Sequence, residues 1–281
     1  MGHRALEAGD VRPLFAGLHA ELVRLLEGLD LADWNRPTLA GAWAVRDVVA
    51  HLLDDDLRRM SRQRDGQDLP APERPVRSEA DLVAFLNGLN AEWVRVARRL
   101  SPRVLVDLLK TTGPAIVELF ASLDPDGPAL FPVAWAGEES SRSWFDVGRE
   151  YTERWHHQQQ VRLAVRAPLL NEPRWLRPVI DLSVRALPHR YRDLAAPEGA
   201  WVRVEIRGAA GGTWSLVRQG SAWSLFAGTA EPSEVARISL DEDTAWRVFF
   251  KALRKDAPPP IVFEGRPDLG RAFLTAWAVM A

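Results

Sequence analysis

The spacing of apolar residues changes near residue 170, and this change most constrains what the chain can fold into. Apolar residues recur every three to four positions in earlier segments such as residues 14–26, which is the pattern of amphipathic helices. Later segments such as residues 201–206 alternate apolar with polar residues, which indicates half-buried strands. We therefore predict a two-domain α+β protein, with a helical domain at residues 1–170 and a smaller α+β domain at residues 171–281.

Four long helices are predicted in the first domain, and together they fit a four-helix bundle. They cover approximately residues 14–26, 42–64, 79–100 and 143–165. Prolines and glycines are expected to break residues 101–141 into short pieces, among them one helix at residues 115–123.

The second domain is predicted to contain short strands and helices, with a mostly antiparallel sheet. Its strands are expected at residues 201–206, 214–216, 223–225, 235–240 and 261–263, and its helices at 177–187, 241–253 and 268–280. Asp241 or Asp243 can cap the middle helix.

The composition narrows the function classes. Of 281 residues, 47% are hydrophobic and 26% charged, which is typical of a globular protein. The net charge of −2 argues against a general nucleic-acid binder. No stretch reaches the roughly 20 apolar residues of a membrane span, and the N-terminus lacks the pattern of a signal peptide, so we expect a soluble cytoplasmic protein without a membrane partner. The chain has no cysteine, so any thiol chemistry must use an external thiol.

Glu153 and His157 are the most informative pair for chemistry, because their spacing of four places them on one face of a predicted helix. A divalent metal can compensate the buried carboxylate and bind both side chains. Alternatively, Glu153 pairs with Arg149 or Arg154, or the face is solvated. Gln160 falls on the same stripe, whereas His156 points to a different side.

His51 is the leading candidate for a third metal ligand, at the edge of the apolar face of the helix predicted at residues 42–64. A histidine at a helix boundary with one ordinary hydrogen bond is the alternative. Asp55 lies one turn further and could accept a hydrogen bond from His51, act as a fourth ligand, or be a surface aspartate. The acidic run 54–56 is expected to form a solvated helix face, with a second metal site as the alternative.

Two histidines and one carboxylate suit zinc best, and nickel, iron or manganese are also compatible. Three protein ligands leave an open position, as in catalytic rather than structural sites. A thiol bound to such a cation is a thiolate at neutral pH, which would provide a nucleophile to a protein without cysteine.

Three segments resemble a known family. Residues 34–52, which contain Trp-x-x-Pro-Thr-x-x-Gly-Ala-Trp and end in His-Leu, resemble the opening motif of the mycothiol-dependent maleylpyruvate isomerase N-terminal domain, a DinB-like four-helix bundle. The Glu153-x-x-x-His157 pair resembles the second motif of that family. Residues 263–274 resemble the end of the sterol-carrier-protein-like domain that is often attached to these bundles.

The resemblance implies a metal-dependent thiol S-transferase or isomerase with His51, Glu153 and His157 as metal ligands. It implies a low-molecular-weight thiol such as mycothiol as cosubstrate and an electrophilic small molecule as substrate, although not maleylpyruvate in particular. Such sequences usually carry an aspartate three residues after the histidine, where this chain has Gln160. The sequence does not address the oligomeric state.

Two other functions remain open at this stage. In the first, the protein is a non-enzymatic binding protein whose C-terminal domain carries a lipid or another apolar small molecule. In the second, the same residues bind iron in a 2-His-1-carboxylate enzyme.

Overall fold

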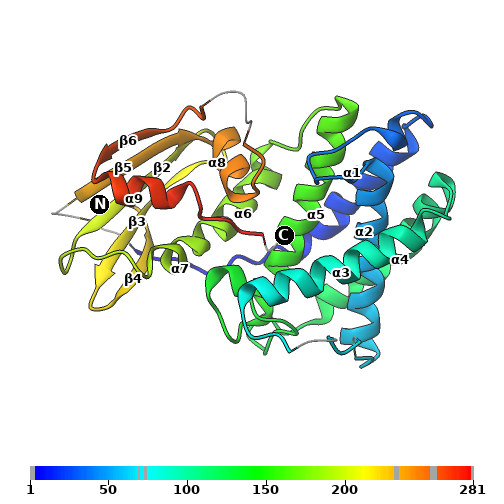
Figure 1. Ribbon diagram of the computed structural model, residues 1–281, viewed down its shortest axis with the longest axis horizontal. Helices are drawn as coiled ribbons and strands as arrows, with labels where there is room; N and C mark the ends of the chain where they lie inside the picture. Colours follow the sequence, from blue (N-terminus) through cyan, green and yellow to red (C-terminus); the bar gives the residue numbers. More distant parts are fainter. Residues whose placement is uncertain (1–3, 69, 73–74, 231–233, 254–257, 280–281) are drawn as a thin grey trace. The chain divides into compact units, whose positions relative to one another are not determined.

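Figure 1 shows a computed structural model, which describes residues 4–68, 70–72, 75–230, 234–253 and 258–279. The described chain folds into two compact units. The helical unit comprises residues 11–130 and 150–170, and the sheet unit comprises residues 4–10, 131–149 and 171–279. The boundary predicted at residue 170 stays a prediction, and each unit is described by itself below.

The helical unit is built from long helices. They are α1 (Phe15–Glu27), α2 (Val45–Arg59), α3 (Glu79–Ala97), α4 (Pro102–Ser122) and the part of α5 (Ser143–Val165) from residue 150 onward. Helix α2 packs against α3 and α4, and α1 packs against α4. The buried apolar side of α2 forms much of the core. Ser78 and Ser101 cap α3 and α4 through their hydroxyl groups.

Helix α4 corrects the prediction for residues 101–141. Residues 102–122 form one helix that contains Pro114, instead of short pieces. Pro102 lies in the first turn, where its missing N–H costs nothing. At Gly113 an added Cβ would lie 2.1 Å from the His19 ring of α1, so glycine permits the close approach of the two helices. Packing against α1 and α2 thus outweighs the helix-breaking tendency of these residues.

The sheet unit confirms the predicted mostly antiparallel α+β arrangement. In the described residues, β1 (Arg4–Ala5), β2 (Trp201–Arg207), β3 (Gly212–Gln219), β4 (Ala222–Ala227), β5 (Glu234–Asp241) and β6 (Val262–Gly265) form one sheet. Its order is β1-β4-β3-β2-β5-β6, and only the β2–β5 pair within it is parallel. The sequence analysis found every strand of this sheet except the two-residue β1.

The helices of the sheet unit differ in their bounds from the prediction. The single helix predicted at 177–187 is α6 (Pro173–Ser183) followed by a 3₁₀ turn and α7 (Leu187–Tyr191). Asp241 caps α8 (Glu242–Phe249) by accepting a hydrogen bond from the backbone N–H of Thr244. The last helix, α9 (Pro267–Phe273), ends earlier than predicted, and residue 280 of that prediction lies outside the described residues.

None of the described helices combines the length and the apolar character that crossing a bilayer requires.

Candidate metal centre

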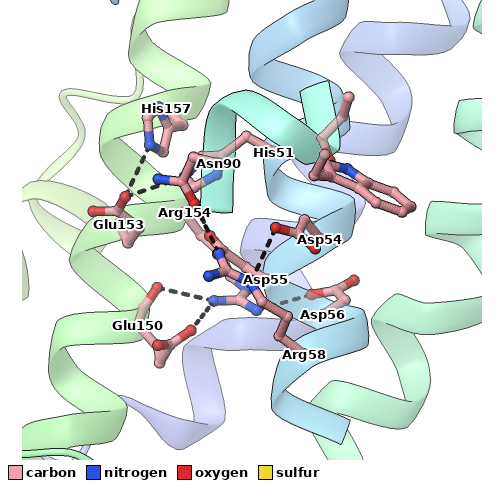
Figure 2. A network of polar contacts seen from close by, with 12 residues as sticks. His51, Asp54, Asp55, Asp56, Arg58, Asn90, Glu150, Glu153, Arg154 and His157 are labelled. Atoms are coloured by element: carbon pink, nitrogen blue, oxygen red, sulfur yellow. Dashed lines mark hydrogen bonds and ion pairs between the residues drawn. The ribbon is translucent and has the colours of Figure 1, made fainter. Parts of the chain in front are cut away.

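The structure brings His51, Glu153 and His157 together within the helical unit (Figure 2). His51 lies in the middle of α2, and the other two residues lie one turn apart on α5. Glu153 Oε1 lies 3.5 Å from His51 Nε2 and 2.9 Å from His157 Nε2. One ligand atom from each residue lies within 4.8 Å of the others. Three side chains from two distant segments therefore point at a common position.

These three side chains differ in exposure. His51 and His157 are buried, with 4% and 7% of their surface exposed, whereas the Glu153 side chain is 29% exposed. The His51 ring lies 5.2 Å from the ring of Trp43, and its Nδ1 is buried with no hydrogen-bond partner among the described residues. The carboxylate therefore forms the accessible side of the cluster.

The electrostatics favour an ionised carboxylate. Burial by itself raises the pKa of Glu153, but His157 and His51 stabilise the charged form and hold that pKa well below its usual range. Burial lowers the pKa of His51, but Asp55 and Glu153 beside it raise that pKa above its ordinary value. Positive charge on a neighbouring imidazole would compensate the carboxylate, and a divalent cation could take over the same role.

Polar residues continue along the buried side of α5. Gln160 Oε1 lies 2.8 Å from His157 Nδ1, and Gln160 Nε2 lies 2.9 Å from His156 Nε2. The ring of His156 lies 4.9 Å from that of His157, so the two histidines lie closer together than the sequence analysis expected. Burial, together with His157 nearby, lowers the pKa of His156 to about 3. A neutral imidazole thus lies beside the candidate centre.

The prediction that the acidic run at 54–56 forms a solvated face is wrong. Asp54 and Asp56 are only 7% and 4% exposed. Arg58 binds two members of the run, with Nε 3.0 Å from Asp54 Oδ2 and Nη2 2.9 Å from Asp55 Oδ1. Asp55 Oδ2 also lies 3.5 Å from His51 Nε2. The run is buried because each charge has a partner, and the spacing of three and four residues between these aspartates and Arg58 was the sequence signal for it.

Asp56 connects α2 to α5 through Arg154, as Figure 2 shows. Arg154 Nη2 lies 2.8 Å from Asp56 Oδ1, and Arg154 Nη1 lies 2.6 Å from Glu150 Oε2. Thr112 of α4 donates a hydrogen bond of 2.7 Å to Asp56 Oδ2. Arg154 therefore pairs with these carboxylates rather than with Glu153. The sequence analysis missed this role, and the signal for it is a carboxylate four residues before Arg154 on the same helix.

The comparisons with known proteins show the family to which this chain belongs. Residues 15–162, more than half of the chain, match the family described as mycothiol maleylpyruvate isomerase N-terminal domain. The chain belongs to this family. The matched range includes His51, Glu153 and His157, and it confirms the resemblance of the first two segments to this family. The resemblance of residues 263–274 to a sterol-carrier-protein-like domain lies outside the matched range and stays a prediction.

One solved structure supports the fold. A crystal structure of a histidine-to-alanine mutant of the mycothiol-dependent maleylpyruvate isomerase is 12% identical, with a TM-score of 0.53, and covers 86% of this chain and 88% of that chain. A second crystal structure of the mycothiol-dependent maleylpyruvate isomerase has the same identity and coverage and a TM-score of 0.49. At this identity the first likeness shows the fold alone. The search of curated proteins finds no match.

Proposed function

We propose that this protein is a metal-dependent thiol S-transferase or isomerase that uses an external low-molecular-weight thiol, such as mycothiol, on an electrophilic small molecule. The observation that carries the proposal is the convergence of His51, Glu153 and His157, whose ligand atoms lie within 4.8 Å of one another. Family membership supports the thiol, because the family is described by mycothiol and maleylpyruvate isomerase.

The donor set fits a divalent cation. Ligand atoms about 2 Å from one ion lie roughly 3–3.5 Å apart, and the distances of Glu153 Oε1 to the two Nε2 atoms are 2.9 and 3.5 Å. Two imidazole nitrogens and one carboxylate oxygen suit zinc, and also nickel, iron and manganese. Three protein ligands leave room for an external ligand, and the partly exposed Glu153 lies on the accessible side.

The residues of the chain would orient and protect the reacting sulfur. A bound divalent cation lowers the pKa of a thiol, so that its sulfur is a thiolate at neutral pH. His51, Glu153 and His157 would hold the cation, and the buried sides of α2 and α5 would limit access of water. The thiol would release its proton to solvent, and the thiolate would add to an electrophilic double bond of the substrate, whose π electrons move onto the neighbouring atom. Transfer would end when that atom takes up a proton, whereas isomerisation would re-form the double bond and expel the thiolate, which regains a proton.

Metal analysis of the purified protein tests the ligand assignment. We expect about one divalent ion per chain, and His51→Ala and Glu153→Ala should each lower the content strongly, because each variant removes one of three ligands. His189→Ala is the matched control, because His189 lies on α7 in the sheet unit, and it should keep the metal. Unchanged metal content in both ligand variants would reject the assignment.

A thiol panel tests the reaction. The full-length protein with its metal should consume a low-molecular-weight thiol or speed its reversible addition to an electrophile, and a chelator should abolish the effect. An iron-loaded protein that takes up oxygen and leaves every thiol unchanged would contradict the proposal and identify an iron enzyme instead.

A further inference from the structure

Gln160 lies between two buried imidazoles on α5. Its Oε1 is 2.8 Å from His157 Nδ1, and its Nε2 is 2.9 Å from His156 Nε2. Gln160, His156 and His157 are 5%, 6% and 7% exposed. Buried polar groups of this kind are costly unless each donor meets an acceptor, so the positions of their hydrogens are constrained.

The amide oxygen of Gln160 determines that Nδ1 of His157 carries a proton. An amide oxygen only accepts hydrogen bonds, so His157 must carry a proton on Nδ1 to make this contact. The other ring nitrogen, Nε2, is the atom that lies 2.9 Å from Glu153 Oε1. A histidine binds a metal through the nitrogen that lacks a proton. A proton fixed on Nδ1 therefore leaves Nε2 as the metal-binding atom of His157, once a cation displaces the proton that Nε2 donates to Glu153 Oε1.

The contact with His156 agrees with this direction of the amide. The Gln160 NH₂ group only donates, so His156 must accept through an unprotonated Nε2. If the amide were turned around, its NH₂ group would face His157 Nδ1. That nitrogen would then have to accept, and the ring proton would move to Nε2, where it blocks metal binding.

We propose that Gln160 is a positioning residue that holds the proton of His157 on Nδ1, and that His156 acts through Gln160 by fixing the direction of the amide. The role in metal binding rests on the proposed function. We call this chain of hydrogen bonds from His156 through Gln160 to His157 the relay. Because the side chain of Gln160 is an uncharged amide, it orients the ligand without adding a second negative charge beside Glu153.

Zinc affinity, measured by competition with a chelating indicator, tests the relay. Gln160→Met keeps the length of the side chain but removes both hydrogen bonds, and it should weaken zinc binding about 10- to 100-fold. His156→Phe should weaken it by a smaller factor. The double variant should bind zinc no more weakly than Gln160→Met alone, because His156 acts only through Gln160.

Gln159→Met is the matched control. Gln159 is a fully buried neighbour on α5, and its Oε1 accepts a hydrogen bond from the backbone N–H of Leu170 rather than from a histidine. The Gln159→Met variant should be less stable than the wild type but should bind zinc with unchanged affinity. The relay is overturned if Gln160→Met binds zinc within threefold of the wild type, or if the His156→Phe loss adds in full to the Gln160→Met loss.

Imidazole ¹⁵N NMR of the metal-free wild type separates the relay from the proposed function. We expect a protonated Nδ1 on His157 and an unprotonated Nε2 on His156. A proton on His156 Nε2 would overturn the relay, whatever the zinc result. A wild type that shows both expected protonation sites but binds no divalent ion supports the hydrogen-bond relay and overturns the metal function instead.

Discussion

At the scale of single residues, Asp54 carries an ionisable group into the buried side of α2. Its side chain meets Arg58 at 3.0 Å, yet burial outweighs this partner and raises its pKa from 3.8 to about 6. Between about pH 4 and pH 6 the folded protein therefore binds more protons at this site than the unfolded chain. The free energy of unfolding must fall as the pH rises through this window.

We expect Asp54→Asn to remove this pH dependence. From pH 4 to pH 7 the free energy of unfolding of the wild type should fall by about 1 kcal/mol more than that of the variant. This figure allows for screening of the Asp54 charge by solvent. Urea unfolding of both proteins at several pH values in this range measures the difference. A difference that is the same at every pH would show that Asp54 does not titrate as described.

The sequence was sufficient to predict the residues of the candidate centre, because their spacing indicates which side chains share a helix face. Glu153 and His157 share a helix face by arithmetic alone, and the motif around His51 marked the third position. The partner of Asp56 is Arg154 on α5, and spacing on one helix does not determine a contact between two helices.

At the scale of elements, Arg154 ties α5 to α2. It bridges Glu150 on its own helix and Asp56 on α2, and the adjacent residue on α5 is Glu153. All three charged side chains of this bridge are 12% exposed or less. The bridge therefore sets the approach of the two helices that carry His51 and Glu153.

Arg154→Met should destabilise the protein by about 3–5 kcal/mol, because it leaves two buried carboxylates without their shared cation. Chemical denaturation at pH 7 measures the loss. Lys110→Met is the control: it also removes an ion pair between two helices, with Glu27, but both side chains are 50% exposed. We expect that control to cost much less, because water screens an exposed ion pair. Equal losses in the two variants would contradict the role of Arg154.

Helix α4 shows why element boundaries were harder to predict than the site. Pro114 and Gly113 are helix breakers by propensity, and the sequence pattern gives them full weight. In the folded chain, Gly113 makes room for the His19 ring, and buried side chains such as Leu105 and Leu109 hold the helix in the core. That compensation comes from tertiary packing and cannot be inferred from the local sequence.

At the scale of the whole molecule, the two units are not consecutive stretches of sequence. Residues 131–149 belong to the sheet unit although they precede residue 170. The strand β1 pairs with β4, more than 200 residues later in the chain. The change of hydrophobic period near residue 170 locates the strands, but it does not record which earlier segments pack with them, because such contacts join residues far apart in sequence.

Phe145 offers a test of this division. It is 3% exposed, and its ring lies 5.5 Å from that of Trp135 and 5.0 Å from that of Trp144. Phe145→Ala should cost about 3–5 kcal/mol through the cavity it leaves, and amide hydrogen exchange should rise first in α6 and α7 of the sheet unit.

Phe120→Ala is the matched control, because that ring is fully buried 4.8 Å from Phe15 in the helical unit, and it should raise exchange in α1 and α4. Faster exchange in α1 and α4 for Phe145→Ala as well would instead favour a boundary at residue 170.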